Sequence, residues 1–179
     1  MRSILILPIF SDKGQLYIDF RYAPFARKLR KSVGDNEEKL MMSNIKTGLE
    51  SAVVSYEFAN YQIDVFVLVL EDDGFVLSAS ITAAGMALIN ASIPCFDMIT
   101  SSSLELSSNN AKEKKDKKKK GDHGVCSLSS LSSIGQITQV MFKGFSDPST
   151  IKKAKDRLHE LNKASSIIYK KAVSVDVLK

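Results

Sequence analysis

Side chains that could bind a metal are sparse in this chain. It has two histidines and two cysteines among 179 residues, and only His123 and Cys126 lie close enough in sequence to share an ion. No second pair completes the four-ligand set of a structural zinc, so we predict no metal site. The run Glu71-Asp72-Asp73 offers oxygen ligands, but its place between an apolar run and a helical pattern is typical of a turn.

Motifs for nucleophilic catalysis or phosphate binding are also missing. Residue counts allow a Ser–His–Asp or Cys–His arrangement, but no nucleophile-elbow sequence surrounds any of the serines. Neither glycine-rich phosphate loop, GxxxxGK(S/T) or GxGxxG, occurs in the chain. The residues themselves therefore predict no catalytic group and no cofactor.

The basic residues are concentrated in two clusters. Residues 26–31 suit contacts with RNA phosphates, although a short like-charge block is also typical of a solvated connector. Residues 112–120 hold seven lysines and two acidic residues. The formal net charge of the whole chain is +5, so this one run accounts for all of it. The remainder is balanced, which argues against a broadly basic nucleic-acid binder.

The elements that would position any site centre on residues 61–98. Residues 63–70 are almost uninterrupted apolar residues, which predicts a strand covered on both faces. A turn ends this strand at Gly74, and residues 78–91 follow with a helical period. Small residues, among them Gly85, keep this helix slim enough to lie close to a sheet. Pro94 ends the helix and a second strand starts near Cys95, which gives a β–α–β unit.

Further elements are expected on both sides of this unit. Residues 4–10 and 15–22 are predicted to be strands joined by a turn at residues 11–14. Met41, Ile45 and Leu49 recur at helical spacing. The second strand of the central unit is expected to continue to Leu106. Strands are then predicted over 125–131 and 136–142, and Pro148 opens a long amphipathic helix.

Composition indicates one globular domain over residues 1–179. Hydrophobic residues make up 44% of the chain and charged residues 25%, as in ordinary globular proteins. Residues 107–124 are polar and rich in lysine, and they lack the apolar side chains needed to order themselves. We interpret them as a disordered insert that either touches RNA or is a solvated loop. The two cysteines favour a reducing compartment, and no apolar run suits a membrane span.

Three motifs in order resemble one family. They are Phe20-Arg21-Tyr22-Ala23-Pro24-Phe25-Ala26, Tyr61-Gln62-Ile63-Asp64-Val65 with its following Asp73-Gly74, and Ile81-Thr82-Ala83-Ala84 leading to Ile93-Pro94. This order is similar to RNase PH-type domains. The resemblance implies an α+β, RNase PH-like (ribosomal protein S5 domain 2-like) fold, with a mixed sheet and βαβ units packed against helices. It also implies that the N-terminal part of the domain is lacking.

The resemblance locates where chemistry would be. Catalytic members of the family hold inorganic phosphate with a Gly-Gly-Thr-Arg-like turn at the start of a helix, and they use a pair of acidic residues that follow the second core strand. Here the second place is the lysine-rich insert and residues 125–130, where Asp116 and Asp122 are the only nearby aspartates. The first place lacks arginine, so we expect a degenerate phosphate site there and no enzyme; its residues are Gly74, Phe75, Val76, Leu77 and Ser78.

An RNase PH-type domain without both elements resembles the non-catalytic ring subunits of the eukaryotic RNA exosome, in particular its mRNA-transport-regulator subfamily. The resemblance implies partners of the same type in a hetero-oligomeric ring, support of rRNA processing and mRNA turnover, and a place in the nucleus, nucleolus and cytoplasm. It also implies weak, sequence-independent RNA contacts, for which the candidates are Arg21, Arg27, Lys28 and Arg30. Two alternatives stay open: an active phosphate-dependent 3′ exoribonuclease, or an unrelated α/β binding domain.

Overall fold

The computed structural model describes residues 12–26, 35–107, 123–144 and 146–177. A short 3-10 helix, η1, spans Ser55–Phe58. The other elements follow in the order β1 (Gln15–Tyr22), α1 (Asp35–Glu50), β2 (Gln62–Val69), α2 (Val76–Asn90), β3 (Ile99–Ser107), β4 (His123–Leu131), β5 (Gln136–Lys143) and α3 (Pro148–Val177).

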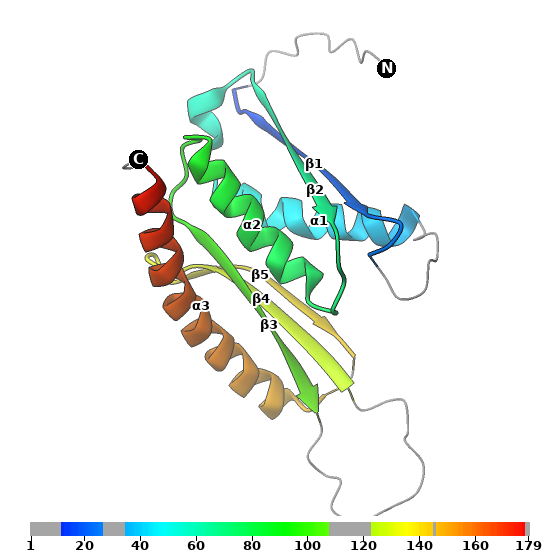
Figure 1. Cartoon of the computed structure of the whole chain (residues 1–179). Helices are drawn as coiled ribbons and strands as arrows, with labels where there is room; N and C mark the ends of the chain where they lie inside the picture. The colour runs from blue at the N-terminus through cyan, green and yellow to red at the C-terminus, as the bar shows by residue number, and fades with distance from the viewer. Residues whose placement is uncertain (1–11, 27–34, 108–122, 145, 178–179) are drawn as a thin grey trace, which may run out of the picture.

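These elements stack in layers. Figure 1 shows the sheet β1–β2 on one outside, then α1 and α2, then the sheet β3–β4–β5, and α3 on the opposite outside. The first sheet is parallel and the second is antiparallel. The predicted α+β class is therefore confirmed, with the strands divided between two sheets.

The first sheet is a β–α–β unit formed by β1, α1 and β2. Its strands run parallel in one register, from Leu16 opposite Ile63 to Phe20 opposite Val67. The sequence placed such a unit at residues 61–100, and the order β2–α2–β3 does occur there. However, β2 and β3 belong to different sheets, so the prediction that these strands share one unit is wrong. The apolar β2 pairs with β1, whereas the serine-rich β3 pairs with β4.

The outer face of this sheet also differs from the prediction. Residues 63–70 were expected to be covered on both faces, but only the face toward α1 and α2 is covered. Val65 and Val67 pack against the core on that side. On the other side Phe66 is 73% exposed and Leu68 is 62% exposed. No described element packs against this outer face, because both neighbouring helices lie on the inner one.

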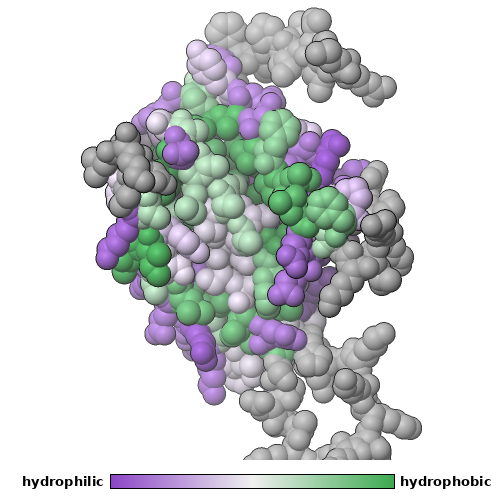
Figure 2. Space-filling view, in the orientation of Figure 1, coloured by the Kyte–Doolittle hydropathy of each residue, from purple (hydrophilic) through white to green (hydrophobic). Residues whose placement is uncertain are grey.

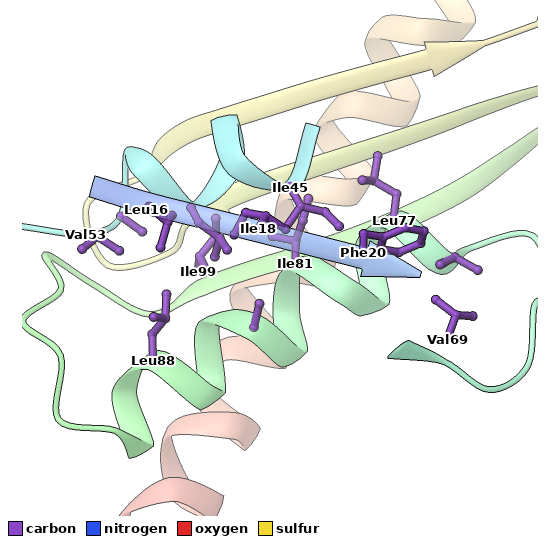
Figure 3. Packing of buried hydrophobic residues seen from close by; sticks show 14 of the residues in the cluster. Leu16, Ile18, Phe20, Ile45, Val53, Val69, Leu77, Ile81, Leu88 and Ile99 are labelled. Carbon is purple, nitrogen blue, oxygen red and sulfur yellow. The ribbon is translucent and has the colours of Figure 1, made fainter. Parts of the chain in front are cut away.

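The main hydrophobic core lies between the two sheets. Figure 3 shows Phe20 of β1, Ile45 of α1 and Ile81 of α2 among the side chains that meet there. All three are fully buried, and each such burial stabilises the fold by about 2 kcal/mol. The helical spacing of Ile45 and Leu49 predicted this face of α1. Gly85 confirms the slim side of α2, since an added Cβ would collide with the side chain of Ile99.

The second sheet is lined with hydroxyl groups. Ser101 and Ser103 of β3 lie opposite Ser129 and Ser127 of β4 on the side of α2. On the other side Asn162 of α3 is fully buried. Its side-chain amide donates to the Leu128 carbonyl and to the Ser130 hydroxyl at 3.0 Å each, and its carbonyl accepts from Ser102. These bonds fix α3 on the sheet and satisfy polar groups that would otherwise be costly to bury.

Some predictions fall on residues outside the described ranges. The expected strand at residues 4–10, the basic cluster from Arg27 onward and nearly all of the predicted insert are among them. The ends of that insert are described, and Ser107 and His123 pair with each other as the last and first residues of β3 and β4. In the part of the chain that the structure describes, no helix is long and apolar enough to cross a membrane.

Candidate functional site

The start of α2 is where the sequence places a degenerate phosphate site. Gly74 has φ of 92°, a conformation that glycine adopts readily, and its N–H donates to Asp72 Oδ1 at 3.0 Å. Phe75 precedes the helix, and no side chain caps the first turn. The turn is thus built from Asp72 and Gly74, and it brings a carboxylate to a helix end that would favour an anionic ligand.

The side chains of the first helical turn point into the protein. Val76, Leu77 and Ser78 are each less than one tenth exposed, and Leu77 belongs to the main core (Figure 3). Phe75 stays 41% exposed at the entrance. No basic side chain comes from residues 74–78, so this turn itself offers a phosphate group only its helix amides.

The hydroxyl of Ser78 is already used within the protein. It donates to the Phe75 carbonyl at 3.0 Å and accepts from Ser103 at 2.7 Å. Ser103 donates its only hydroxyl proton to Ser78, so it acts as the acceptor in its 2.7 Å hydrogen bond with Ser127, and Ser127 is the donor. This chain of three hydroxyls ends at Phe75 and leaves Ser78 without a proton to donate to a ligand.

A hollow of about 460 Å³ lies beside this turn. Its walls come from α1, the 72–77 turn, β4 and β5. Lys143 is the one basic side chain among the described residues that line it, and the carboxylates of Glu37 and Asp72 line it as well. Two acids and one base make the hollow unfavourable for a phosphate dianion. The described lining residues are Tyr22, Glu37, Met41, Asp72, Gly74, Phe75, Val76, Leu77, Val125, Ser127, Met141, Lys143 and Gly144.

Arg21 is the one RNA-contact candidate that the structure describes. It lies on the outer face of β1, and its side chain is 72% exposed. Its Nε donates to Asp19 Oδ1 at 3.3 Å. That hydrogen bond and the Asp19 charge raise the pKa of Arg21, so the guanidinium is already partly neutralised by its neighbour. Arg27, Lys28 and Arg30 lie outside the described residues.

The other candidates for chemistry do not meet at this place. Among the described residues, no three His, Cys, Asp or Glu side chains come together as a ligand set. Burial raises the pKa of Cys126, which lies in β4 as predicted, and burial also raises the pKa of Cys95. Both thiols are thereby held in the less reactive protonated form. Asp116 and Asp122 lie outside the described residues.

Sequence reasoning missed two features of this region. Lys143 reaches the hollow from the end of β5, and Ser103 and Ser127 link the hollow to the first turn of α2. The serine-rich runs at residues 101–103 and 127–130 were the available signal. Every second residue of a strand faces the same side, so serines two apart share a face, but the sequence does not say that a helix covers that face.

Comparison with known proteins identifies what the chain is similar to. The family model described as 3′ exoribonuclease family, domain 1 (RNase PH) matches residues 7–94. Exosome complex component MTR3 of Homo sapiens is 37% identical over 100 residues, which are 55% of this chain and 37% of that protein. The mtr3 component of Schizosaccharomyces pombe is 31% identical over 103 residues, covering 56% of this chain and 40% of that protein.

Other similarities extend the comparison. Exosome complex component Rrp41 of Nitrosopumilus maritimus is 37% identical over 90 residues, 50% of this chain and 37% of that protein. The matched stretch thus spans about two fifths of these relatives. The crystal structure of rice (Oryza sativa) Rrp46 superposes with a TM-score of 0.72 at 14% identity, over 97% of this chain and 77% of that one. This likeness confirms the RNase PH-like fold for nearly the whole chain.

Proposed function

We propose that this chain, which belongs to the RNase PH family, is a non-catalytic structural subunit of an exosome ring. The relatives titled MTR3 and the fold neighbour titled Rrp46 support this proposal. Its partners are other RNase PH-type subunits in a hetero-oligomeric ring. In this role the chain supports 3′–5′ RNA processing and turnover in the nucleus, nucleolus and cytoplasm, and it contacts RNA weakly.

The observation that carries the non-catalytic part of the proposal is the closed first turn of α2. Val76 and Leu77 are buried where a phosphate-holding turn would need open, polar contacts. Ser78 donates its proton to the backbone, and the neighbouring hollow is lined by the carboxylates of Glu37 and Asp72. Each of these features opposes binding of a dianion, so we propose that the turn acts as scaffold.

Ring membership is tested by reconstitution. The purified chain is mixed with the other RNase PH-type subunits of an exosome ring, and the mixture is separated by size-exclusion chromatography. We expect the chain to elute with the ring, in stoichiometric amount. A correctly folded chain that elutes alone under conditions in which the other subunits associate would contradict the proposal.

A second candidate, a phosphate-dependent 3′ exoribonuclease, is favoured by the description of the matching family model. The test measures nucleoside diphosphate release from a 3′-tailed RNA with and without inorganic phosphate. We expect no phosphate-dependent release from the chain alone. Release that is lost in the variant Lys143→Ala, but kept in the exposed-lysine control Lys163→Ala, would establish this second function and refute our proposal. The unrelated-binding-domain alternative is set aside by the family match.

A further inference from the structure

The outer face of the first sheet is an exposed apolar surface. Phe66 and Leu68 project from the same side of β2, Leu70 directly follows the strand, and all three are more than 60% exposed. Tyr17 of β1 adds a side chain that is 54% exposed. Hydrophobic side chains are visible at the surface over this sheet in Figure 2. A contiguous apolar patch of this kind marks an interaction surface.

This patch has an acidic border. Asp64 lies beside Phe66 on the outer face, and exposed Glu71 and Asp73 follow directly after Leu70. Asp19 is paired with Arg21, the single basic residue among the described residues of this face. The described part of the border is therefore net negative, which favours a partner whose apolar surface is edged with basic residues.

The C-terminal half of α3 has the complementary surface. Leu161 and Ile168 are exposed on one side of the helix, one heptad apart, with exposed Ala164 between them. Residues 161–174 include three lysines and no acidic residue. Exposed Lys171 lies one turn from Ile168 and exposed Arg157 lies one turn from Leu161, against one exposed acid, Glu160, one turn from Ala164. Lys170 forms an ion pair with Asp97 at 2.7 Å.

The two surfaces belong to opposite outside layers of the molecule. Figure 1 shows β1–β2 and α3 separated by α1, α2 and the second sheet. A molecule cannot bring its own α3 onto its own first sheet without dismantling the layers between them. Two molecules can make this contact, and the pair then still has one free sheet face on one molecule and one free α3 face on the other. A contact of this type is heterologous, and it continues as a ring or a filament.

We propose that this chain self-associates head to tail, with α3 of one copy packed on the outer face of β1–β2 of the next. The apolar side chains of Ile168 and Leu161 cover Phe66 and Leu68, and the lysines of α3 face the acidic border. Two strands of eight residues form a face of roughly 26 Å by 10 Å. The contact is therefore small, and it is expected to be weak, in the micromolar range.

The first test measures molecular mass against concentration by sedimentation equilibrium, at about 10–200 µM chain, a range that brackets such an affinity. We expect mass to rise with concentration beyond that of a monomer. Phe66→Thr and Ile168→Gln should each weaken the association about tenfold or more. The control Leu40→Gln changes a residue of α1 that is 52% exposed and belongs to neither surface, and its association should equal that of the parent chain.

Mixing the two variants distinguishes this contact from the alternatives. Phe66→Thr retains an intact α3 surface, and Ile168→Gln retains an intact sheet surface. Each variant alone should associate about tenfold more weakly than the parent chain, whereas their mixture should recover one contact of parental strength and form a dimer that does not grow further with that strength. A chain that associates through two copies of the sheet face would lose association in Phe66→Thr but keep it in Ile168→Gln, and this would overturn the proposal.

Charge reversal supplies an independent readout. Glu71→Lys should weaken the association, and Lys171→Glu in the partner copy should restore part of it in a mixture of the two variants. Association should also weaken as salt is added, because the charged border is exposed. Monomeric parent chain at 200 µM, with a normal circular dichroism spectrum, would refute the inference. Ring reconstitution is measured separately, so its result does not decide this one.

Discussion

The sheet β3–β4–β5 lies between α2 and α3, yet the side chains between it and the helices include many hydroxyls. The sheet β1–β2 has one face without a described cover, yet that face presents Phe66 and Leu68. Burial in this molecule therefore does not follow polarity alone. The serine hydroxyls of β3 and β4 are tolerated inside because they hydrogen-bond to one another, to Ser78 of α2 and to Asn162 of α3, whereas the apolar residues outside have no such compensation and favour contact with a partner surface.

Among the substitutions considered, a change at Asn162 is expected to lower stability most, because this residue holds α3 on the second sheet. Asn162→Ala removes the bonds to Leu128, Ser130 and Ser102. The Leu128 carbonyl keeps its bond from Ser101, but the Ser130 and Ser102 hydroxyls lose the partner that Asn162 gave them. We expect the free energy of unfolding to fall by about 3 kcal/mol, as measured by urea denaturation. The exposed position Asn90→Ala is the control and should change it by less than about 0.5 kcal/mol. A near-neutral Asn162→Ala would mean that this network does not hold α3.

The close approach of α2 to the second sheet is tested at Gly85. Gly85→Ala adds a methyl group that collides with buried Ile99, and the helix has to move outward. Overpacking of this kind is expected to lower the unfolding free energy by about 2 kcal/mol, despite the better helix propensity of alanine. Thermal unfolding measures this change. Ala83→Ser, on the exposed side of the same helix, is the matched control.

Asp97 links the second sheet to α3 in a pH-dependent way. Burial raises the pKa of Asp97, but its hydrogen bonds with Lys170, Ser133 and Met98 outweigh this effect, so the pKa lies below the usual value. A carboxyl with a lowered folded-state pKa contributes stability at neutral pH that is lost on acidification below about pH 4. Asp97→Asn should lower the unfolding free energy by about 1 kcal/mol at pH 7.

The same difference between parent and Asp97→Asn should be smaller at pH 2 than at pH 7, because acidification progressively neutralises the Asp97 carboxylate. Urea denaturation at the two pH values measures it. The control is Asp156→Asn, which changes an exposed carboxylate of α3. A constant difference at both pH values would show that Asp97 acts through shape and not through its charge.

The smallest effect on stability is expected on the bare face of the first sheet. Phe66→Thr replaces an exposed ring with a β-branched polar side chain that suits a strand. In the monomer the unfolding free energy should change by less than about 0.5 kcal/mol. The inward-facing Val67→Thr is the matched control, and it should destabilise the chain measurably because Val67 packs against the core. If the two substitutions changed the unfolding free energy equally, the outer face of β2 would not differ from the inner face in its contribution to stability.

Much of this fold was predictable from spacing in the sequence. The faces of α1 and β1, the slim side of α2 at Gly85 and the start of α3 at Pro148 all follow from local periodicity and helix-start signals. The bare side of β2 was not predictable, because Phe66 and Val67 look alike in an apolar run. Which of them is covered depends on where helices distant in sequence pack.

The candidate site was predictable to a similar extent. The segment 74–78 does lie at the start of α2, as its sequence indicated, and its interpretation as a degenerate phosphate site stays a prediction. The partners of Ser78 could not be predicted, since Ser103 and Ser127 reach it from other strands. The roles expected for Arg21 and for the basic cluster that follows it remain predictions.

The pairing of Ser107 with His123 has a practical consequence. The two strands that flank the lysine-rich residues are joined along nine residue pairs. This pairing is complete at Ser107 and His123, so it does not depend on the residues between them. Lengthening such a connection costs only about 0.6 kcal/mol for each doubling. The junction is thus a place to insert a fluorescent or affinity label while keeping α2, α3 and both outer surfaces unchanged.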